Sequence, residues 1–430
     1  MRFAILLLVV LTARVGIAHD ENWNQFRGPR GDGTSTERGL PVTFSEGSPE
    51  IVWKTPVPGR AWSSPVIWGK QVWMTNAPEV VQGTKPDKPK LDKPIELSAV
   101  CVDFDTGAIV HNIKLFEVKE PQVTHPTNTF ASPTPYVEEG RVYVHFGAYG
   151  TACLDTKTGQ TIWERRDLEC DHFRGPGSSP VVYHGMLYLT FDGFDVQYIT
   201  ALDKMTGKTV WRKDRNIDYG TTDGDAKKAY STPILIQDEG RELLISPFAK
   251  ATIAYDPRTG DPIWTVRHGG MNAAGRPLFG NGLLYITTAD GPNPLIAIPP
   301  QGQGDITERM AWRSNKSTPK RPSPILLGDL LFMINDGGVA SCLDAKTSTE
   351  IWTKRLSGEY WASPLYADGL IYCFAQNGTI PVFKASREFE QVAENKLDSG
   401  FVASPAVAGK SLVLRSKTHL YRIEKVGGEK

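Results

Sequence analysis

The stretch A-L-D-K-M-T-G-K-T-V-W, from Ala201 to Trp211, decides the fold because variants of it recur along the chain. An Asp ends one apolar strand, Thr-Gly supplies a hydroxyl and a positive φ for a tight turn, and an apolar strand carrying a Trp follows. Related copies end at Trp163, Trp264 and Trp352, and a weaker copy ends at His111. The pattern predicts one β-hairpin, repeated.

A second signal alternates with this hairpin: a small residue, then Pro, then apolar residues. It occurs eight times, starting at Ser63, Ala131, Ser178, Ser231, Gly275, Pro322, Ala362 and Ala403. Its prolines are Pro65, Pro133, Pro180, Pro233, Pro277, Pro324, Pro364 and Pro405, and most neighbours lie 40 to 53 residues apart. A period in the forties fits one four-stranded propeller blade per repeat.

The two ends of the chain hold incomplete units. The last unit, from Ala403, ends without a fourth strand, whereas Ile51–Lys54 reads as a fourth strand with its Trp but without the preceding three. A closed ring leaves no open repeat. We therefore expect an all-β, eight-bladed propeller of four-stranded antiparallel blades, closed by pairing of the N-terminal strand with the strand around Leu420 and Tyr421.

The sequence divides into a signal peptide (1–18), an N-terminal extension (19–50), the propeller (51–426) and a tail (427–430). The apolar run Phe3–Leu11 precedes a small-x-small site ending at Ala18, which is typical of a cleaved secretory signal and too short to span a bilayer. No Cys lies near that site. We expect an exported protein, periplasmic or secreted, that is not a lipoprotein.

Charge and composition exclude several classes. The whole chain has 48 basic and 48 acidic residues. Loss of Arg2 and Arg14 with the signal would leave a slight acidic excess, so nucleic-acid binding and membrane insertion are not expected. Five Cys in a chain of 430 residues are not typical of a disulfide framework. No His pair has the spacing of metal ligands, so we expect no metal site.

The repeats resemble the pyrroloquinoline-quinone-like (PQQ-like, quinoprotein-type) eight-bladed propellers, and A-x-D-x-x-T-G-x-x-x-W is similar to that family's tryptophan docking motif. The resemblance extends over about residues 51–426. The family includes quinone-dependent alcohol and sugar dehydrogenases and also non-catalytic members such as the outer-membrane assembly factor BamB. The stretch Trp23–Gly33, W-N-Q-F-R-G-P-R-G-D-G, is similar to the start of exported bacterial proteins of this group.

The resemblance implies one of two alternatives, a bound cofactor or none. A dehydrogenase would bind PQQ with calcium and would need an Asp base, whereas a scaffold would bind no cofactor. Those dehydrogenases often carry two adjacent Cys over the quinone, and no two Cys are adjacent here. A C-x-x-C-H haem-attachment motif is also absent from the sequence. Asp-Gly and Asn-Gly pairs at Asp192, Asp290, Asp336 and Asn377 fit hairpin turns, although the same carboxylates could serve an enzyme.

The repeated indoles could form a ligand-stacking array, but their fixed place in the last strand favours packing between blades. We predict structural docking by Trp53, Trp163, Trp211, Trp264, Trp312 and Trp352. Cys101, Cys153 and Cys342 occupy the motif position of Ala201 and Ala254, so a core role is favoured over metal binding.

Aromatic and basic residues precede the small-Pro signals, on connections that enter the innermost strands near the mouth of the channel. Such a ring suits a flat or anionic ligand, although aromatics that plug the channel and solvated cations are the alternative. The candidate ligand-binding residues are Trp62, Phe130, Arg174, Lys228, Tyr230, Arg276, Arg321, Tyr360 and Trp361.

The sequence therefore predicts a non-catalytic binding or scaffold module. Its partner would be a protein or a small anionic, planar molecule at the mouth of the channel. The alternative is a PQQ-dependent oxidoreductase of the alcohol or sugar dehydrogenase kind, which would have a carboxylate cluster around a deep pocket in the channel.

Overall fold

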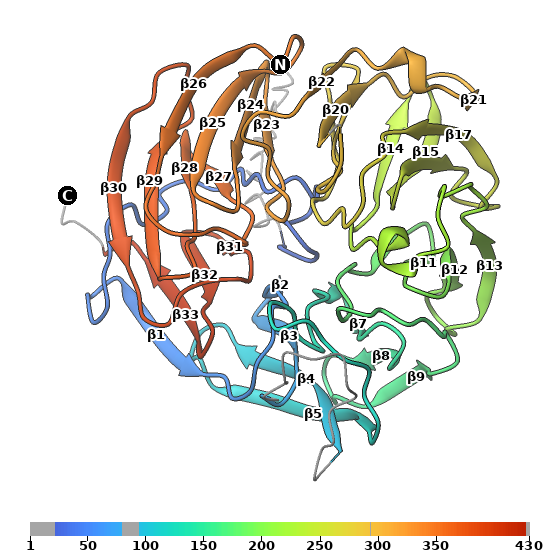
Figure 1. Ribbon diagram of the computed structural model, residues 1–430. Helices are drawn as coiled ribbons and strands as arrows, with labels where there is room; N and C mark the ends of the chain where they lie inside the picture. Colours follow the sequence, from blue (N-terminus) through green and yellow to red (C-terminus); the bar gives the residue numbers. More distant parts are fainter. Residues whose placement is uncertain (1–21, 80–93, 293, 427–430) are drawn as a thin grey trace, which may run out of the picture.

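The computed structural model describes residues 22–79, 94–292 and 294–426, and the chain forms eight antiparallel sheets arranged radially around one axis (Figure 1). Each sheet is a blade whose strands run in order from the axis outward. The strands of blades 1 to 4 are β2 (Val66–Trp68), β3 (Gln71–Asn76), β4 (Ile95–Asp103) and β5 (Ile109–Val118); β6 (Tyr136–Glu138), β7 (Arg141–His145), β8 (Thr151–Asp155) and β9 (Thr161–Arg165); β10 (Val181–Tyr183), β11 (Met186–Asp192), β12 (Gln197–Asp203) and β13 (Thr209–Asp214); and β14 (Ile234–Asp238), β15 (Arg241–Pro247), β16 (Ala251–Tyr255) and β17 (Pro262–Arg267).

The second half of the ring repeats this plan. The strands of blades 5 to 8 are β18 (Leu278–Gly280), β19 (Leu283–Thr287), β20 (Leu295–Ile298) and β22 (Trp312–Ser314); β23 (Ile325–Leu327), β24 (Leu330–Ile334), β25 (Val339–Asp344) and β26 (Glu350–Arg355); β27 (Leu365–Ala367), β28 (Leu370–Tyr372), β29 (Thr379–Lys384) and β30 (Gln391–Lys396); and β31 (Ala406–Ala408), β32 (Ser411–Arg415), β33 (His419–Glu424) and β1 (Ile51–Pro56). The predicted fold class, eight four-stranded antiparallel blades, is confirmed.

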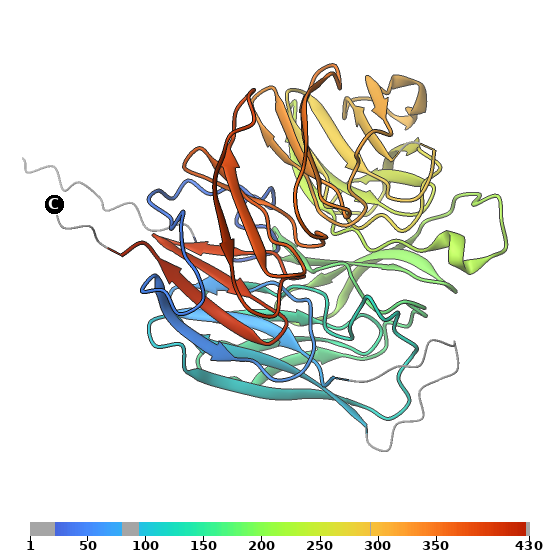
Figure 2. The same ribbon diagram turned by 60° about the vertical axis from the view of Figure 1, so that its left-hand side comes forward.

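The N-terminal strand closes the ring as the sequence predicts. β1 pairs antiparallel with β33, with Lys54 opposite Tyr421 and Thr55 opposite Leu420. In Figure 2 the blue strand β1 lies against the red strands of the last blade. Blade 8 is thus built from both ends of the propeller, and its sheet has four strands.

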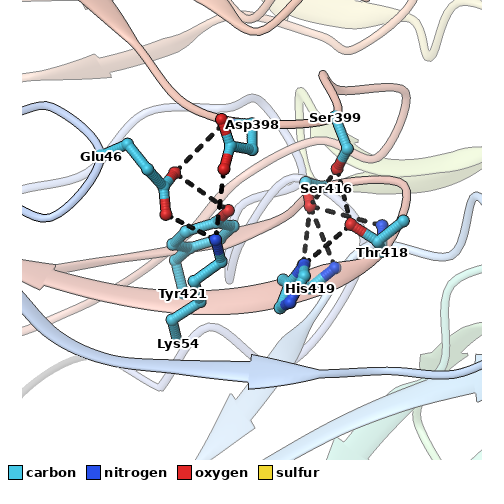
Figure 3. A network of polar contacts seen from close by, with 8 residues as sticks. All are labelled: Glu46, Lys54, Asp398, Ser399, Ser416, Thr418, His419 and Tyr421. Carbon is cyan, nitrogen blue, oxygen red and sulfur yellow. Dashed lines mark hydrogen bonds and ion pairs between the residues drawn. The ribbon is translucent and has the colours of Figure 1, made fainter.

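Polar side chains reinforce this seam (Figure 3). Lys54 Nζ lies 2.5 Å from Glu46 Oε1 and 3.4 Å from Asp398 Oδ2, and the Tyr421 hydroxyl donates to Glu46 Oε2 at 3.3 Å. A neighbouring hydroxyl cluster around His419 ties the loop before blade 8 to β33. The extension, β1, β33 and the preceding loop therefore meet at one junction.

The repeated hairpin docks one blade on the next. Asp203 Oδ1 accepts from both the backbone N–H and the hydroxyl of Thr206 at 2.8 Å, which shapes the turn after β12. Gly207 has φ +70°, and a Cβ there would lie 2.6 Å from the ring of Trp163 in the preceding blade. The Trp163 indole N–H donates to the Lys204 carbonyl at 3.0 Å. The turn needs Gly because the indole packs on its backbone.

Among the described residues, the same contact recurs at six of the eight junctions between blades. Each indole N–H donates at 2.7–3.1 Å to a carbonyl in the next blade: Trp53 to Phe104, Trp163 to Lys204, Trp211 to Pro257, Trp264 to Pro300, Trp312 to Ala345 and Trp352 to Ser386. All six indoles are buried or half-buried. Each therefore contributes apolar area and one directional bond to a junction.

In blade 2 the repeat proline lies two residues later than the sequence pattern predicts. In the other seven blades the innermost strand begins directly after the repeat proline, as β2 begins after Pro65. In blade 2 that strand begins at Tyr136, so the repeat proline is Pro135 rather than Pro133. The sequence S-P-T-P contains two candidates, and only the start of the strand separates them.

Some predicted segments lie outside the described residues: the signal peptide (1–18), the first residues of the extension, most of the loop 78–94 and the tail 427–430. The Gly/Gln-rich stretch 299–309 is described. It forms β21 (Gly304–Asp305), which pairs in parallel with β17, and the 3₁₀-helix η2 (Thr307–Arg309); a second 3₁₀-helix, η1 (Gly224–Lys227), precedes blade 4. No helix in the described ranges is long and apolar enough to cross a membrane.

Candidate functional site

The N-terminal segment 22–35 crosses the ring near its axis, where it is drawn in blue (Figure 1). In blade 1 the backbone N–H of Ile67 donates to the Trp23 carbonyl at 2.8 Å. In blade 7 the N–H of Tyr366 donates to the Gly33 carbonyl at 2.9 Å. The segment is therefore bonded to the propeller at both of its ends.

Two buried arginines fasten the middle of this segment. Arg276 donates from Nη1 to the Phe26 carbonyl at 2.6 Å and from Nη2 to Gln25 Oε1 at 3.0 Å. Arg27 donates from Nη2 to the Pro324 carbonyl at 2.5 Å. Burial lowers the pKa of Arg27 to about 9 and that of Arg276 to about 10. The segment is thus held as a floor across the channel, with Phe26 fixed in its middle.

A cavity of about 240 Å³ opens at the mouth of the channel, and Phe26 is among its lining residues. All eight blades contribute the residue three positions before the repeat proline. These lining residues are Trp62, Ser132, Gly177, Tyr230, Ala274, Arg321, Trp361 and Val402. Equivalent positions of a propeller lie on one circle, so residues far apart in sequence converge here.

Two indoles in the cavity wall are paired with guanidinium groups. The Arg60 guanidinium lies 5.2 Å from the centre of the Trp62 ring, and that of Arg321 lies 4.4 Å from the Trp361 ring. The Trp62 indole N–H donates to the Thr127 carbonyl at 3.1 Å. Both rings are half-buried and held in place, and each can offer a flat surface to a ligand.

Positive charge exceeds negative charge around the cavity. Arg174, Lys320 and Arg321 line it, and the carboxylate among the lining residues is Asp290. Lys320 Nζ lies 2.6 Å from Asp290 Oδ1, and Arg321 Nη1 lies 2.5 Å from Asp336 Oδ1. The lining therefore carries a net positive charge, which favours an anionic ligand.

The pKa of His125, another lining residue, reports this electrostatic environment. It is lowered first by burial and then by the positive charges of Arg174, Arg321 and Lys228. A neutral imidazole is favoured where cations already surround it.

Below the indoles, hydroxyls link the innermost residues of neighbouring blades; we call this set the hydroxyl ring. Each member lies directly before a repeat proline, and its oxygen accepts a backbone N–H from the equivalent residue of a neighbouring blade at 2.9–3.0 Å. The pairs, donor first, are Ser404 to Ser64, Ser64 to Thr134, Thr134 to Ser179, Ser179 to Thr232, Arg276 to Ser323, Ser323 to Ser363 and Ser363 to Ser404. Blade 5 has Arg276 at this position instead of a hydroxyl residue.

The structure brings five of the nine candidate ligand-binding residues together. Trp62, Arg174, Tyr230, Arg321 and Trp361 all line the cavity. Four of these precede the repeat proline by three residues, and Arg174 reaches the cavity from the loop that leads into blade 3.

The other four candidates are buried elsewhere, which corrects their placement at the mouth. Phe130 is 3% exposed and packs edge-on against Tyr149. Tyr360 is fully buried, and its hydroxyl donates to a backbone carbonyl. Lys228 is fully buried and paired with Asp225. These three residues lie four or five positions before their repeat prolines, so their side chains leave the cavity. Arg276 is buried as well; it lies directly before its repeat proline, as the hydroxyl ring does, but its side chain is bonded to the floor segment.

Sequence reasoning missed several lining residues, among them His125, Asn128, Asn272 and the hydroxyls. The hydroxyls could have been found, because Ser or Thr before the repeat proline is the most regular feature of the repeat. Asn128 and Asn272 come from connections that vary in length between blades, so no fixed spacing marks them.

The donor set around the cavity does not fit calcium. Calcium takes six to eight oxygen ligands, with carboxylates prominent among them, and Asp290 is already paired with Lys320. Asp192, one of the turn carboxylates, forms a buried bidentate pair with Arg215, both contacts at 2.8 Å. No group of three or more His, Cys, Asp or Glu suited to a metal occurs within the described residues.

Known proteins with related sequences fall into two functional groups. A segment of 142 residues is 27% identical to methanol dehydrogenase [cytochrome c] subunit 1 of Methylobacterium organophilum, covering 30% of this chain and 22% of that protein. A segment of 133 residues is 29% identical to the outer membrane protein assembly factor BamB of Kangiella koreensis, covering 29% of each chain. The chain thus matches less than a third of the length of these curated relatives.

Solved structures share the fold at low sequence identity. BamB from Moraxella catarrhalis has a TM-score of 0.58 at 13% identity, covering 87% of this chain and 99% of that one. A europium-containing methanol dehydrogenase has a TM-score of 0.66 at 11% identity, covering 93% and 90%. A family model described as outer membrane protein assembly factor BamB matches residues 96–246 and 303–388. Since that match covers more than half of the residues, this chain belongs to the BamB family of PQQ-like propellers.

Proposed function

We propose that this chain is an exported, non-catalytic binding module that takes a small anionic, planar ligand at the mouth of its channel. The observation that carries the proposal is the cavity to which all eight blades contribute, lined by two indoles and three cations with Phe26 at its floor. Planar surfaces and excess positive charge together match a flat anion.

Binding would combine two forces. The half-buried faces of Trp62 and Trp361 offer stacking surfaces that are already ordered, so little side-chain entropy is lost when a ligand arrives. Arg174 is available to pair with an anionic ligand, because its contact with the Asp225 carboxylate is long, at 3.5 Å. The contacts of Lys320 and Arg321 are shorter, 2.6 and 2.5 Å.

A PQQ-dependent oxidoreductase is less well supported. Bound PQQ with calcium would supply two-electron redox chemistry, but the lining as described offers one carboxylate, Asp290, which is already paired with Lys320. Neither a free Asp base nor a calcium ligand set is available among the described lining residues. Equilibration with PQQ and calcium, followed by dye-linked alcohol oxidation, is expected to give no turnover; sustained turnover would establish the enzyme instead.

A scaffold role toward a protein partner is the second candidate, and one surface feature favours it. Phe173 and Phe194 stack with their ring centres 5.1 Å apart, and each is 37% exposed. Exposed aromatic pairs are typical anchors of protein interfaces. Phe173 directly precedes Arg174, so this pair lies close to the cavity.

Isothermal titration calorimetry of the purified protein with naphthalene-2-carboxylate tests the binding proposal. Arg174→Gln with Arg321→Gln is expected to weaken binding about tenfold to a hundredfold, since charge-assisted bonds contribute about 1.5–3 kcal/mol. The loss should shrink at high salt. Arg258→Gln, on an exposed arginine paired with Glu242 at the outer edge of blade 4, is the matched control. Equal affinity in all variants would contradict the proposal.

A further inference from the structure

We infer that the hydroxyl ring makes the base of the cavity an oxyanion site, which receives the acid end of the ligand; this inference rests on the proposed function. It assigns an orientation, with the acid group deep in the channel and the aromatic group between the indoles. It also names a ligand class: planar molecules that carry a carboxylate, sulfonate or phosphate at one end.

Six hydroxyls of the ring line the cavity, and Ser323 does not. The six are Ser64, Thr134, Ser179, Thr232, Ser363 and Ser404. All are between 2% and 5% exposed. The cavity therefore reaches polar groups that are almost completely withdrawn from solvent.

The bonding of these hydroxyls leaves their protons unused. A hydroxyl has one proton to donate and two lone pairs to accept with. Each of the six oxygens already accepts a backbone N–H. Among the contacts of the described residues, none of the six donates its proton to a protein acceptor. The ring therefore offers the cavity O–H donors that converge from six blades.

Donors without acceptors select the chemistry of their ligand. A buried polar group that lacks a partner costs free energy, and hydrogen bonds to an ionised acceptor are among the strongest. A carboxylate or sulfonate has only acceptor atoms and satisfies several hydroxyls at once. A cationic group can use the second lone pair of each oxygen, but it leaves the hydroxyl protons unpaired and is repelled by the net positive lining, so it is disfavoured.

The cations nearer the mouth fit a steering role. Lys320 and Arg321 are already paired with Asp290 and Asp336. Their remaining positive potential attracts an anion into the cavity, and Phe26 stops it at the level of the ring. The acid group then binds the hydroxyls, while the positive charges of Arg174 and Arg321 continue to stabilise it in the cavity.

Two probes of the same shape test the chemistry: naphthalene-2-carboxylate and naphthalene-2-carboxamidine, each titrated into the mature protein by calorimetry. Two variants, Ser363→Ala and Ser404→Ala, remove hydroxyls that line the cavity. Ser323→Ala is the matched control, because it breaks the same kind of backbone-to-hydroxyl bond at a ring member outside the cavity. Thermal unfolding of all three variants checks that they fold.

We expect the carboxylate to bind at least tenfold more tightly than the amidine. Each lining variant should weaken the carboxylate about tenfold, as loss of a bond to a charged acceptor does, while Ser323→Ala changes it less than twofold. Equal losses in Ser323→Ala and Ser363→Ala, or no loss in the lining variants, would overturn the oxyanion site. Dependence on Arg174 and Arg321 would still uphold the proposed function in that case.

A second arm separates the two proposals if the carboxylate does not bind, which would defeat the planar-ligand proposal. Inorganic sulfate then probes the ring alone, through the rise in unfolding temperature over chloride at equal ionic strength. A rise present in the wild type and in Ser323→Ala but absent in Ser363→Ala with Ser404→Ala would keep the oxyanion site. The same rise in every variant would reject it.

Discussion

Trp211 illustrates what one side chain contributes to a junction between blades. It is 8% exposed and donates to the Pro257 carbonyl of blade 4 at 3.1 Å. We expect Trp211→Ala to lower the free energy of unfolding by about 3–5 kcal/mol, because a large buried side chain is replaced by a cavity. Urea unfolding measures the change. Val210→Ala, on a neighbour that is 49% exposed, should change it by less than about 0.5 kcal/mol.

Arg276 stands directly before the repeat proline of blade 5, where the other blades have Ser or Thr, and its side chain holds the floor segment. We expect Arg276→Ser, which restores the residue type of the other ring positions, to loosen segment 22–35 because both bonds to Gln25 and Phe26 are lost. Trypsin cleavage after Arg27 or Arg30 should become about tenfold faster, in line with the loss of about 1.5 kcal/mol of local stability. Arg258→Ser is the control. Unchanged cleavage would show that the backbone bonds alone hold the segment.

At this scale the sequence predicts residue types better than side-chain directions. Trp62, Arg321 and Trp361 converge as expected, because each precedes the repeat proline by the same number of residues. Tyr360, one residue earlier than Trp361, points into the interior instead. In an extended chain successive side chains point to opposite sides, so an offset of one residue decides between cavity and core.

The strand β1 is the element on which ring closure depends. A chain that begins after Pro56 lacks β1 and exposes the edge of β33, so we expect it to aggregate. Light scattering and size-exclusion chromatography measure this. A chain that begins at Gly47 loses the floor segment but keeps β1, and it should stay monomeric. A monomeric, soluble protein without β1 would contradict the role of the seam.

Among the elements, the blades and their closure follow from the sequence, while the attachments do not. The hairpin repeats because Asp, Thr and Gly set the turn locally. Strand 51–54 has no partner strands in a repeat of its own, and the last blade is the one that lacks a fourth strand in the sequence. The strand β21 could not be foreseen, because its two residues pair with β17 of the preceding blade and carry no strand pattern. The floor was likewise missed, since its anchor, Arg276, reads as a candidate ligand contact.

The stability of the whole molecule should fall in mild acid. His145, His172 and His268 are buried, and burial lowers their pKa values to about 3, 4 and 4. In the unfolded chain they titrate near about 6.5, so between about pH 6.5 and pH 4 the unfolded state binds more protons and stability falls as pH falls. Three such groups cost at most about 4 kcal/mol per pH unit in the middle of that range.

Urea unfolding at pH 7, 6 and 5 at constant ionic strength measures this slope. We expect His145→Gln to reduce the slope by about a third, whatever it does to stability at pH 7. Val210→Ala, on an exposed residue without a titratable group, should leave the slope as it is. Equal stability at pH 7 and pH 5 in the wild type would show that these imidazoles are not kept neutral by the fold.

Within the described residues, segment 22–35 lies across the channel below the cavity, and a ligand reaches the cavity from the mouth. A molecule that enters must leave by the same way, so a second molecule cannot displace the first from behind or pass it. Occupancy is then limited to one ligand per chain, and different ligands compete for it. The rim that admits a ligand also sets how long it stays.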